Sequence, residues 1–210
     1  CIFTLFATIG KASHVQETTE TGNNILILNS YNESSPWSNS ITTPIVHKIA
    51  GIENMDAYIE HLNLFMVGDS TKIERFPEIL SSKYGSTPPR LLVFIGSMSL
   101  IFREEIQSLW GKVPAIVCGA DPYVYHEKFY RQRDTVTPEE KTHMSELAEE
   151  FNFTYMHTPI YLEENVQLMC RMIPGMKKLI FLGDGIYPNP EYDKQQRELI
   201  KDKYPQMDYE

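Results

Sequence analysis

The sequence is poor in cysteine, and the three cysteines that it has are not arranged as ligands or as a disulfide framework. Cys1, Cys118 and Cys170 are the only cysteines among 210 residues, and no CxxC pair or zinc-type spacing occurs. This argues against a zinc module and against a small disulfide-stapled fold. Cys118 and Cys170 lie in apolar stretches, where a free cysteine behaves as a small hydrophobe. A bridge between them is the less favoured alternative.

The sequence also lacks the short motifs that carry common enzyme chemistry. It contains no GxxxxGK phosphate loop, no GxGxxG after its first apolar run, no HExxH pair and no GxSxG elbow. These absences remove the usual sequence evidence for nucleotide binding, zinc proteolysis and serine hydrolysis. We therefore expect no catalytic residues, no metal ligands and no cofactor.

Positive charge is scarce as well. The chain has 19 basic and 28 acidic residues, which gives a net charge of −9, and its basic residues form no cluster larger than Lys177-Lys178. A protein that neutralises nucleic-acid phosphates needs a basic surface, so we expect no nucleic-acid partner. The hydrophobic fraction of 42% is ordinary for a folded globular protein.

The first 23 residues differ from the rest of the chain. Cys1 to Ile9 is an apolar run that resembles the end of a secretory signal peptide, and Lys11 to Asn23 is polar. We expect residues 1–23 to be a signal-peptide remnant and flexible leader, which makes the protein an exported one. The alternative is that the apolar run forms a first strand.

The centre of the chain predicts a parallel sheet. Leu91 to Ile95 and Ala115 to Cys118 are continuous apolar runs, as expected of strands buried on both faces. Between them, Leu100, Ile106 and Trp110 have the spacing of one helix face. A strand, a helix and a strand within about 30 residues form a right-handed crossover.

Similar units flank this centre, and they predict an α/β protein with a doubly wound parallel sheet. We expect a complete first lobe over residues 24–157 and the start of a truncated second lobe over residues 158–210, with a linker at His157-Thr158-Pro159. Pro44 either kinks the helix over residues 38–50 or delays its start to near Thr43. The other predicted elements are strands over 24–30, 55–62, 153–156 and 178–182, and helices over 70–84 (inner face Ile73, Phe76, Ile79, Leu80 and Tyr84), 137–151, 162–173 and 192–204.

Polar and aromatic residues follow several predicted strands at their carboxyl ends, where open α/β sheets bind ligands. The aromatic members are Tyr31, Trp37, Tyr123 and Tyr125. Aromatic rings on a cleft rim stack on rings, sugars and apolar ligand faces, and the alternative is that they serve lobe packing or are ordinary surface aromatics. We expect recognition to centre on the first two, with Ser97 and Asp121 supplying polar contacts.

Two features of this edge have more than one interpretation. Gly96-Ser97 before a helix either presents free amides to an anion or only ends a strand. Asp121 and Asp184 follow predicted strands and would be a carboxylate pair in a hydrolase or a flavodoxin-like enzyme. A capping or hydrogen-bonding role at the edge of the sheet is favoured for both.

The sequence resembles a known family in four segments spread over residues 24–210, which are ILILNSYNESSPWSNSI, LLVFIGSMSLIFREEI, VPAIVCGADPY and ENVQLMCRMIPGMKKLIFLGDGIY. It is similar to type 1 periplasmic-binding-fold proteins of the ABC substrate-binding kind, used as extracytoplasmic sensor domains in bacterial hybrid two-component histidine kinases. Pro44 and the long segment 123–150 depart from that pattern.

The resemblance implies a non-enzymatic domain that binds a small molecule between two lobes. It implies a periplasmic location, a parent protein anchored in the inner membrane, and a transmembrane helix and kinase module beyond residue 210. A solute-binding protein of an ABC importer is the alternative, and a homodimer is left open. The ligand-binding positions that it implies are Ser30, Tyr31, Trp37, Gly96, Ser97, Ala120, Asp121, Asp184 and Tyr187.

Overall fold

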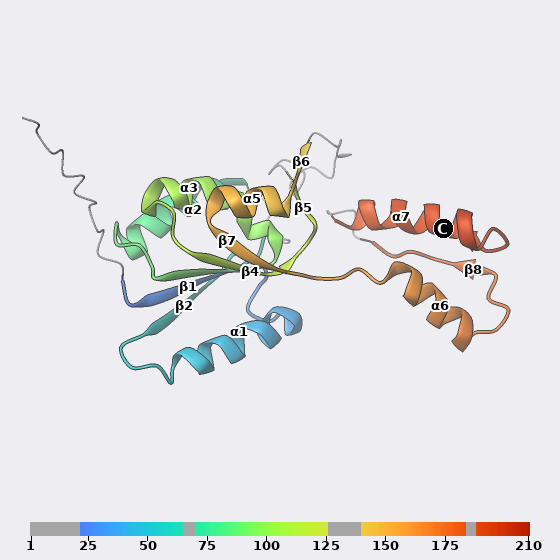
Figure 1. The fold of residues 1–210 in the computed structure, drawn as a ribbon, viewed down its shortest axis with the longest axis horizontal. Coiled ribbons are helices and arrows are strands. Elements are labelled where there is room, and N and C mark those ends of the chain that lie inside the picture. The colour runs from blue at the N-terminus through green and yellow to red at the C-terminus, as the bar shows by residue number, and fades with distance from the viewer. Residues whose placement is uncertain (1–21, 65–69, 126–139, 184–187) are drawn as a thin grey trace, which may run out of the picture.

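The computed structural model describes residues 22–64, 70–125, 140–183 and 188–210. Helices and strands alternate along most of this chain (Figure 1). In chain order the elements are β1 (Asn24–Asn29), α1 (Pro36–Ile49), β2 (Asp56–His61), α2 (Ser70–Tyr84), β3 (Leu91–Ile95), a 3₁₀ helix (Ser97–Phe102), α3 (Arg103–Trp110), β4 (Ala115–Ala120), β5 (Tyr123–Tyr125), β6 (Lys141–His143), α5 (Met144–Phe151), β7 (Phe153–His157), α6 (Leu162–Met172), β8 (Lys178–Leu179), α7 (Asn189–Lys203) and β9 (Asp208–Tyr209).

A five-stranded parallel sheet in the order β2-β1-β3-β4-β7 forms the centre of the first lobe. Helix α1 covers one face of this sheet, and α2, α3 and α5 cover the other (Figure 1). The predicted doubly wound α/β fold is confirmed. The strand predicted over residues 55–62 is β2, which lies at an edge of the sheet and has a partly polar sequence.

The apolar strands are buried on both faces. In β1, Leu26 and Leu28 face a core shared with α2, α3 and α5, while Ile25 and Ile27 belong to a second core under α1. Alternation of side chains along a strand divides these residues between the two layers. This arrangement explains why β1 has apolar residues at successive positions and not an alternation of apolar and polar residues.

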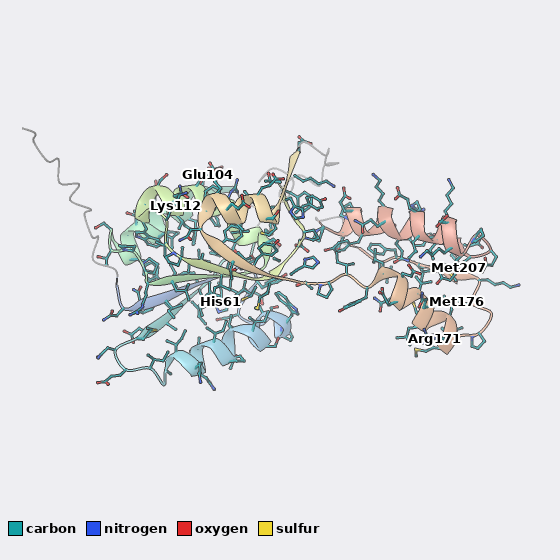
Figure 2. The ribbon with its side chains drawn as sticks, viewed as in Figure 1. His61, Glu104, Lys112, Arg171, Met176 and Met207 are labelled. Atoms are coloured by element: carbon teal, nitrogen blue, oxygen red, sulfur yellow. The ribbon has the colours of Figure 1, made fainter. Side chains whose placement is uncertain are left out.

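The second unit is smaller and contains α6, α7 and a two-stranded parallel sheet of β8 and β9. Val166, Ile200 and Met207 form its buried core, and Met176 packs against them (Figure 2). An extended segment after β7 leads into this unit, where the sequence predicted a linker (Figure 1). None of the helices in the described part of the chain has the length and apolarity needed to cross a membrane.

The ends of some elements differ from the sequence-based expectation. Helix α1 starts at Pro36 and continues through Pro44, so the later start near Thr43 is wrong. In α2, Ile79 is 47% exposed, so its placement on the inner face is also wrong. Gly22 and Asn23, assigned to the leader, already bond to the lobe, because the Gly22 N–H donates to the Pro88 carbonyl at 2.9 Å and the Asn23 carbonyl accepts from Asp56 at 3.2 Å. Residues 1–21 lie outside the described part.

The helix predicted from Thr137 begins later. Residues 141–143 form β6, which pairs antiparallel with β5, and α5 begins at Met144. His143 caps this helix, with Nδ1 accepting from the Ser145 N–H at 3.2 Å. The pairing of β6 with β5 therefore interrupts the predicted helix at residues 141–143, and residues 137–139 lie outside the described ranges.

The strand predicted over residues 178–182 is shorter and more exposed than expected. Only Lys178 and Leu179 pair with β9, while Ile180 is 56% and Leu182 is 90% exposed. Within the described residues this run has one strand neighbour, β9, whereas β1, β3 and β4 each have a strand on both sides. Cys118 and Cys170 are free, so the disulfide alternative is wrong.

Candidate functional site

Ser97 and Asp121 join the turns that follow β3 and β4. The Ser97 hydroxyl donates to Oδ2 of Asp121 at 2.8 Å and accepts from the Asp121 backbone N–H at 2.9 Å. Because β3 and β4 are parallel neighbours, their carboxyl ends bring these residues to the same edge of the sheet. The prediction that both lie at one edge is confirmed by this contact.

Ser30 and Ala120 lie beneath that edge, and both are fully buried. The Ser30 hydroxyl accepts from the Ser99 N–H at 2.9 Å and donates to the Gly96 carbonyl at 3.3 Å. The Ala120 carbonyl accepts from the Thr158 N–H at 3.0 Å. These two residues position the turns, and their assignment as ligand contacts stays a prediction.

Tyr31 and Trp37 form an aromatic pair on the same edge. Their ring centroids are 5.1 Å apart at an interplanar angle of 59°. Trp37 covers Gly119, where an added Cβ would lie 2.3 Å from Cη2 of the indole, and Tyr31 lies against Gly96, where the corresponding distance to Cε2 is 3.0 Å. Both glycines have positive φ, so the backbone conformation and the close approach of a ring both require glycine at these positions.

Asn29 holds the loop that carries the aromatic pair, and sequence reasoning missed it. Its Oδ1 accepts from the Tyr31 N–H at 3.0 Å, and its Nδ2 donates to the Ser38 hydroxyl at 3.2 Å. His61 Nδ1 lies 3.3 Å from the same nitrogen. The side chain is fully buried, so it fixes the loop and does not reach a ligand. A polar residue at the end of an apolar strand was the available signal.

Tyr192 is the second residue that the sequence did not indicate. It lies in α7 of the second unit, and its hydroxyl donates to Oδ1 of Asp121 at 2.8 Å. The neighbouring Glu191 lies 3.8 Å from Nζ of Lys141 in β6. The start of α7 thus contacts the first lobe at two points. Asp184 and Tyr187, the two predicted site residues of the second lobe, lie outside the described residues.

The other two predicted rim aromatics are engaged within the first lobe. Tyr125 is buried, at 6% exposure. Tyr123 packs edge-on against His143, with ring centroids 5.3 Å apart, and Lys141 Nζ lies 4.7 Å from the centre of its ring. These contacts lie within the first lobe, and a role of this pair at the rim of a cleft stays a prediction.

Burial and the Asp121 carboxylate keep the phenols of the site protonated. Burial, and secondly the negative charge of Asp121, raise the pKa of Tyr31 from 10.0 to about 12. The same two causes, together with the hydrogen bond to Asp121, raise the pKa of Tyr192. Both rings therefore present a neutral hydroxyl, as donor or acceptor, at physiological pH.

The raised pKa of Tyr31 predicts a loss of stability at alkaline pH. Below the ordinary value of 10.0 the phenol is protonated in the folded and the unfolded chain, so it adds no pH dependence. Between pH 10.0 and about 12 the unfolded chain binds fewer protons, so the free energy of unfolding falls as the pH rises. The slope from this group is at most about 1.4 kcal/mol per pH unit, because a single proton is involved, and solvent screening of the partly exposed ring makes it smaller.

Urea unfolding at pH 9 and pH 11, on the wild type and on Tyr31→Phe, measures this contribution. The wild type should lose more stability between the two pH values than the variant does. Equal losses in both proteins would contradict the assignment.

The described residues do not assemble a metal-binding group. No set of three His, Cys, Asp or Glu side chains among them is placed to hold a metal ion. Burial raises the pKa of the Cys118 thiol, which disfavours the reactive thiolate form. The carboxylate pair of the hydrolase alternative requires Asp184, which lies outside the described part. What the geometry offers is a carboxylate, phenol hydroxyls and an aromatic surface, which are groups that bind ligands.

Comparison with known proteins supports the fold. No protein-family model and no curated protein matches the sequence. A ligand-free, open structure of a substrate binding protein with adhesive properties from Clostridium difficile is similar, with a TM-score of 0.52 and 10% identity over 89% of this chain and 56% of that protein. An ABC domain in complex with L-Trp from Streptococcus pneumonia gives a TM-score of 0.48 and 15% identity over 89% of this chain and 55% of its own.

At such low identity, the similarity to the Clostridium difficile protein shows the fold alone. The central parallel sheet flanked by helices is an architecture found in substrate-binding proteins. The chain spans little more than half the length of either protein, 56% and 55%.

Proposed function

We propose that the chain is a non-enzymatic domain that binds a small molecule at the carboxyl edge of its parallel sheet, between the first lobe and α7. The observation that carries this proposal is the position of Asp121. This carboxylate bonds to Ser97 of the first lobe and to Tyr192 of the second unit, beside the Tyr31–Trp37 pair. A ligand held there contacts both units, so its affinity depends on how they are arranged.

The finer proposal is an extracytoplasmic sensor domain of a two-component histidine kinase, in which closure of the lobes on the ligand is passed to a kinase module through the membrane. Its support is the resemblance of the sequence segments described above. The alternative is a solute-binding protein of an ABC importer, and the fold shared with a substrate binding protein from Clostridium difficile favours it equally. Sequencing the complete gene distinguishes them, because a membrane span followed by a kinase module supports the sensor.

A thermal-shift screen tests the binding function itself. Sugars, amino acids, nucleosides, aromatic metabolites and amines should include a compound that raises the melting temperature of the chain. A ligand at a hundred times its dissociation constant stabilises the folded state by about 2.7 kcal/mol. A screen in which no compound from any of these classes stabilises the protein would contradict the proposal.

Two substitutions then locate the binding site of a compound found in this way. Trp37→Ala removes half of the aromatic pair, and Asp121→Ala removes the shared carboxylate. Each should weaken binding at least about tenfold in calorimetry, because a stacked ring and a buried hydrogen bond to a charge each contribute 1 kcal/mol or more. Trp110→Phe, in the core away from this edge, is the control and should leave the affinity unchanged. Unchanged affinity in both site variants would place the ligand elsewhere.

A further inference from the structure

The Asp121 carboxylate has a negative charge that its described partners do not balance. Its hydrogen bonds come from the hydroxyls of Ser97 and Tyr192, which are both neutral. A carboxylate can accept about four hydrogen bonds, so these two leave room for further donors. The residue is partly buried already, and covering it with a ligand would remove more water from a charge without a counter-ion.

Lys141, a basic residue that contacts the start of α7, is otherwise engaged. Lys141 lies 3.8 Å from Glu191, the residue before Tyr192, and its Nζ stands over the Tyr123 ring. The charges of this lysine and this glutamate compensate each other, so Lys141 does not balance the charge of Asp121.

Aromatic rings lie around the carboxylate. Tyr31 is close enough to Asp121 for the carboxylate to help raise its pKa, and Trp37 lies beside Tyr31 over Gly119, two residues before Asp121. Tyr192 approaches from the second unit. The face of an aromatic ring attracts a cation, and the attraction strengthens where water is excluded.

We propose that the site takes a small organic cation, with an ammonium group held at Asp121 and an apolar or aromatic body against Tyr31 and Trp37. This inference rests on the proposed binding function and adds the chemical class of the ligand. The ammonium group balances the carboxylate and faces the rings, whereas a neutral ligand such as a sugar would leave the charge buried and unpaired. An anionic ligand would add a second negative charge beside the first.

Three probes of similar size and different charge test the class at pH 7. They are benzylammonium, benzyl alcohol and benzoate, titrated into the full chain by calorimetry. Benzylammonium should bind at least about tenfold more tightly than benzyl alcohol, because an ion pair with a partly buried carboxylate adds 1.4 kcal/mol or more, and benzoate should bind weakest.

Asp121→Asn tests whether this discrimination comes from the carboxylate. The amide keeps an acceptor oxygen for the neighbouring hydroxyls and removes the charge, so the ratio of the benzylammonium and benzyl alcohol affinities should fall to near one. Glu104→Gln removes a charge from an exposed position on α3, where the side chain is 71% exposed, and should leave the ratio as in the wild type (Figure 2).

The remaining outcomes distinguish a failure of this inference from a failure of the proposed binding function. No binding of benzylammonium, equal affinity for benzyl alcohol, or tighter binding of benzoate would overturn the cationic class. A discrimination that survives in Asp121→Asn would overturn the role of this carboxylate. In any of these cases a neutral or anionic compound that loses affinity in Trp37→Ala would still support a small-molecule site at this edge.

Discussion

Replacing Leu28 by alanine should lower the free energy of unfolding by about 2–5 kcal/mol, the range for a buried leucine that leaves a cavity. Leu28 lies in β1, which has β2 on one side and β3 on the other, and its side chain is fully buried in the core under α2, α3 and α5. The surrounding strands are fixed by backbone hydrogen bonds on both sides, so the core cannot collapse onto the vacated space. Urea unfolding measures the loss.

Ile79→Ala is the matched control for this experiment. It removes an aliphatic side chain of the same size from α2, where 47% of the residue is exposed. We expect a change of about 0.5 kcal/mol or less, as for most surface substitutions. Similar losses in the two variants would contradict the assignment of the core.

Gly119→Ala should have the second largest effect, and it should act on the site as well as on stability. The residue has a φ of +71°, which strains any side chain and costs on the order of 1–3 kcal/mol. The new methyl group would also lie 2.3 Å from Cη2 of Trp37, so the indole has to leave its position. We therefore expect lower stability together with a change in the fluorescence of Trp37 and weaker ligand binding.

A background of Trp110→Phe makes this measurement specific, because Trp37 is then the only tryptophan in the chain. Gly111→Ala is the control, since Gly111 has the same φ of +71° but no atom within 4 Å of an added Cβ. It should lose stability through backbone strain alone and leave the fluorescence of Trp37 unchanged. An unchanged spectrum in Gly119→Ala would show that the ring does not lie on this glycine.

The central strands β1, β3 and β4 could be predicted from the sequence, because burial on both faces gives them continuous apolar runs. Runs such as Leu91 to Ile95 are apolar at every position, and glycines with positive φ end or interrupt them. The contact of Ser97 with Asp121 followed from the same rule, since parallel neighbouring strands end at one edge. These features depend on a few consecutive residues and on general geometry.

Contacts between distant segments produce no recognisable pattern in a few consecutive residues. Tyr192 reaches Asp121 across 71 residues of chain, and its surroundings in the sequence are those of an ordinary charged helix. The helix predicted over residues 137–151 is interrupted at residues 141–143 for a related reason, because the pairing of β6 with β5 is a tertiary contact. The sequence thus predicted the residues of the first lobe at this site, and it did not indicate Tyr192, which contacts them from the second unit.

The short segment between β7 and α6 affects the free energy with which α7 docks on the first lobe. It ties α7 to the lobe that it contacts, so the bond from Tyr192 to Asp121 and the ion pair of Glu191 with Lys141 form at a high effective concentration, on the order of millimolar for a short tether. Contacts too weak to hold two separate molecules together are then enough to populate the docked arrangement. A ligand that binds the docked arrangement more tightly then shifts the population towards it, by as much as its affinities for the two arrangements differ.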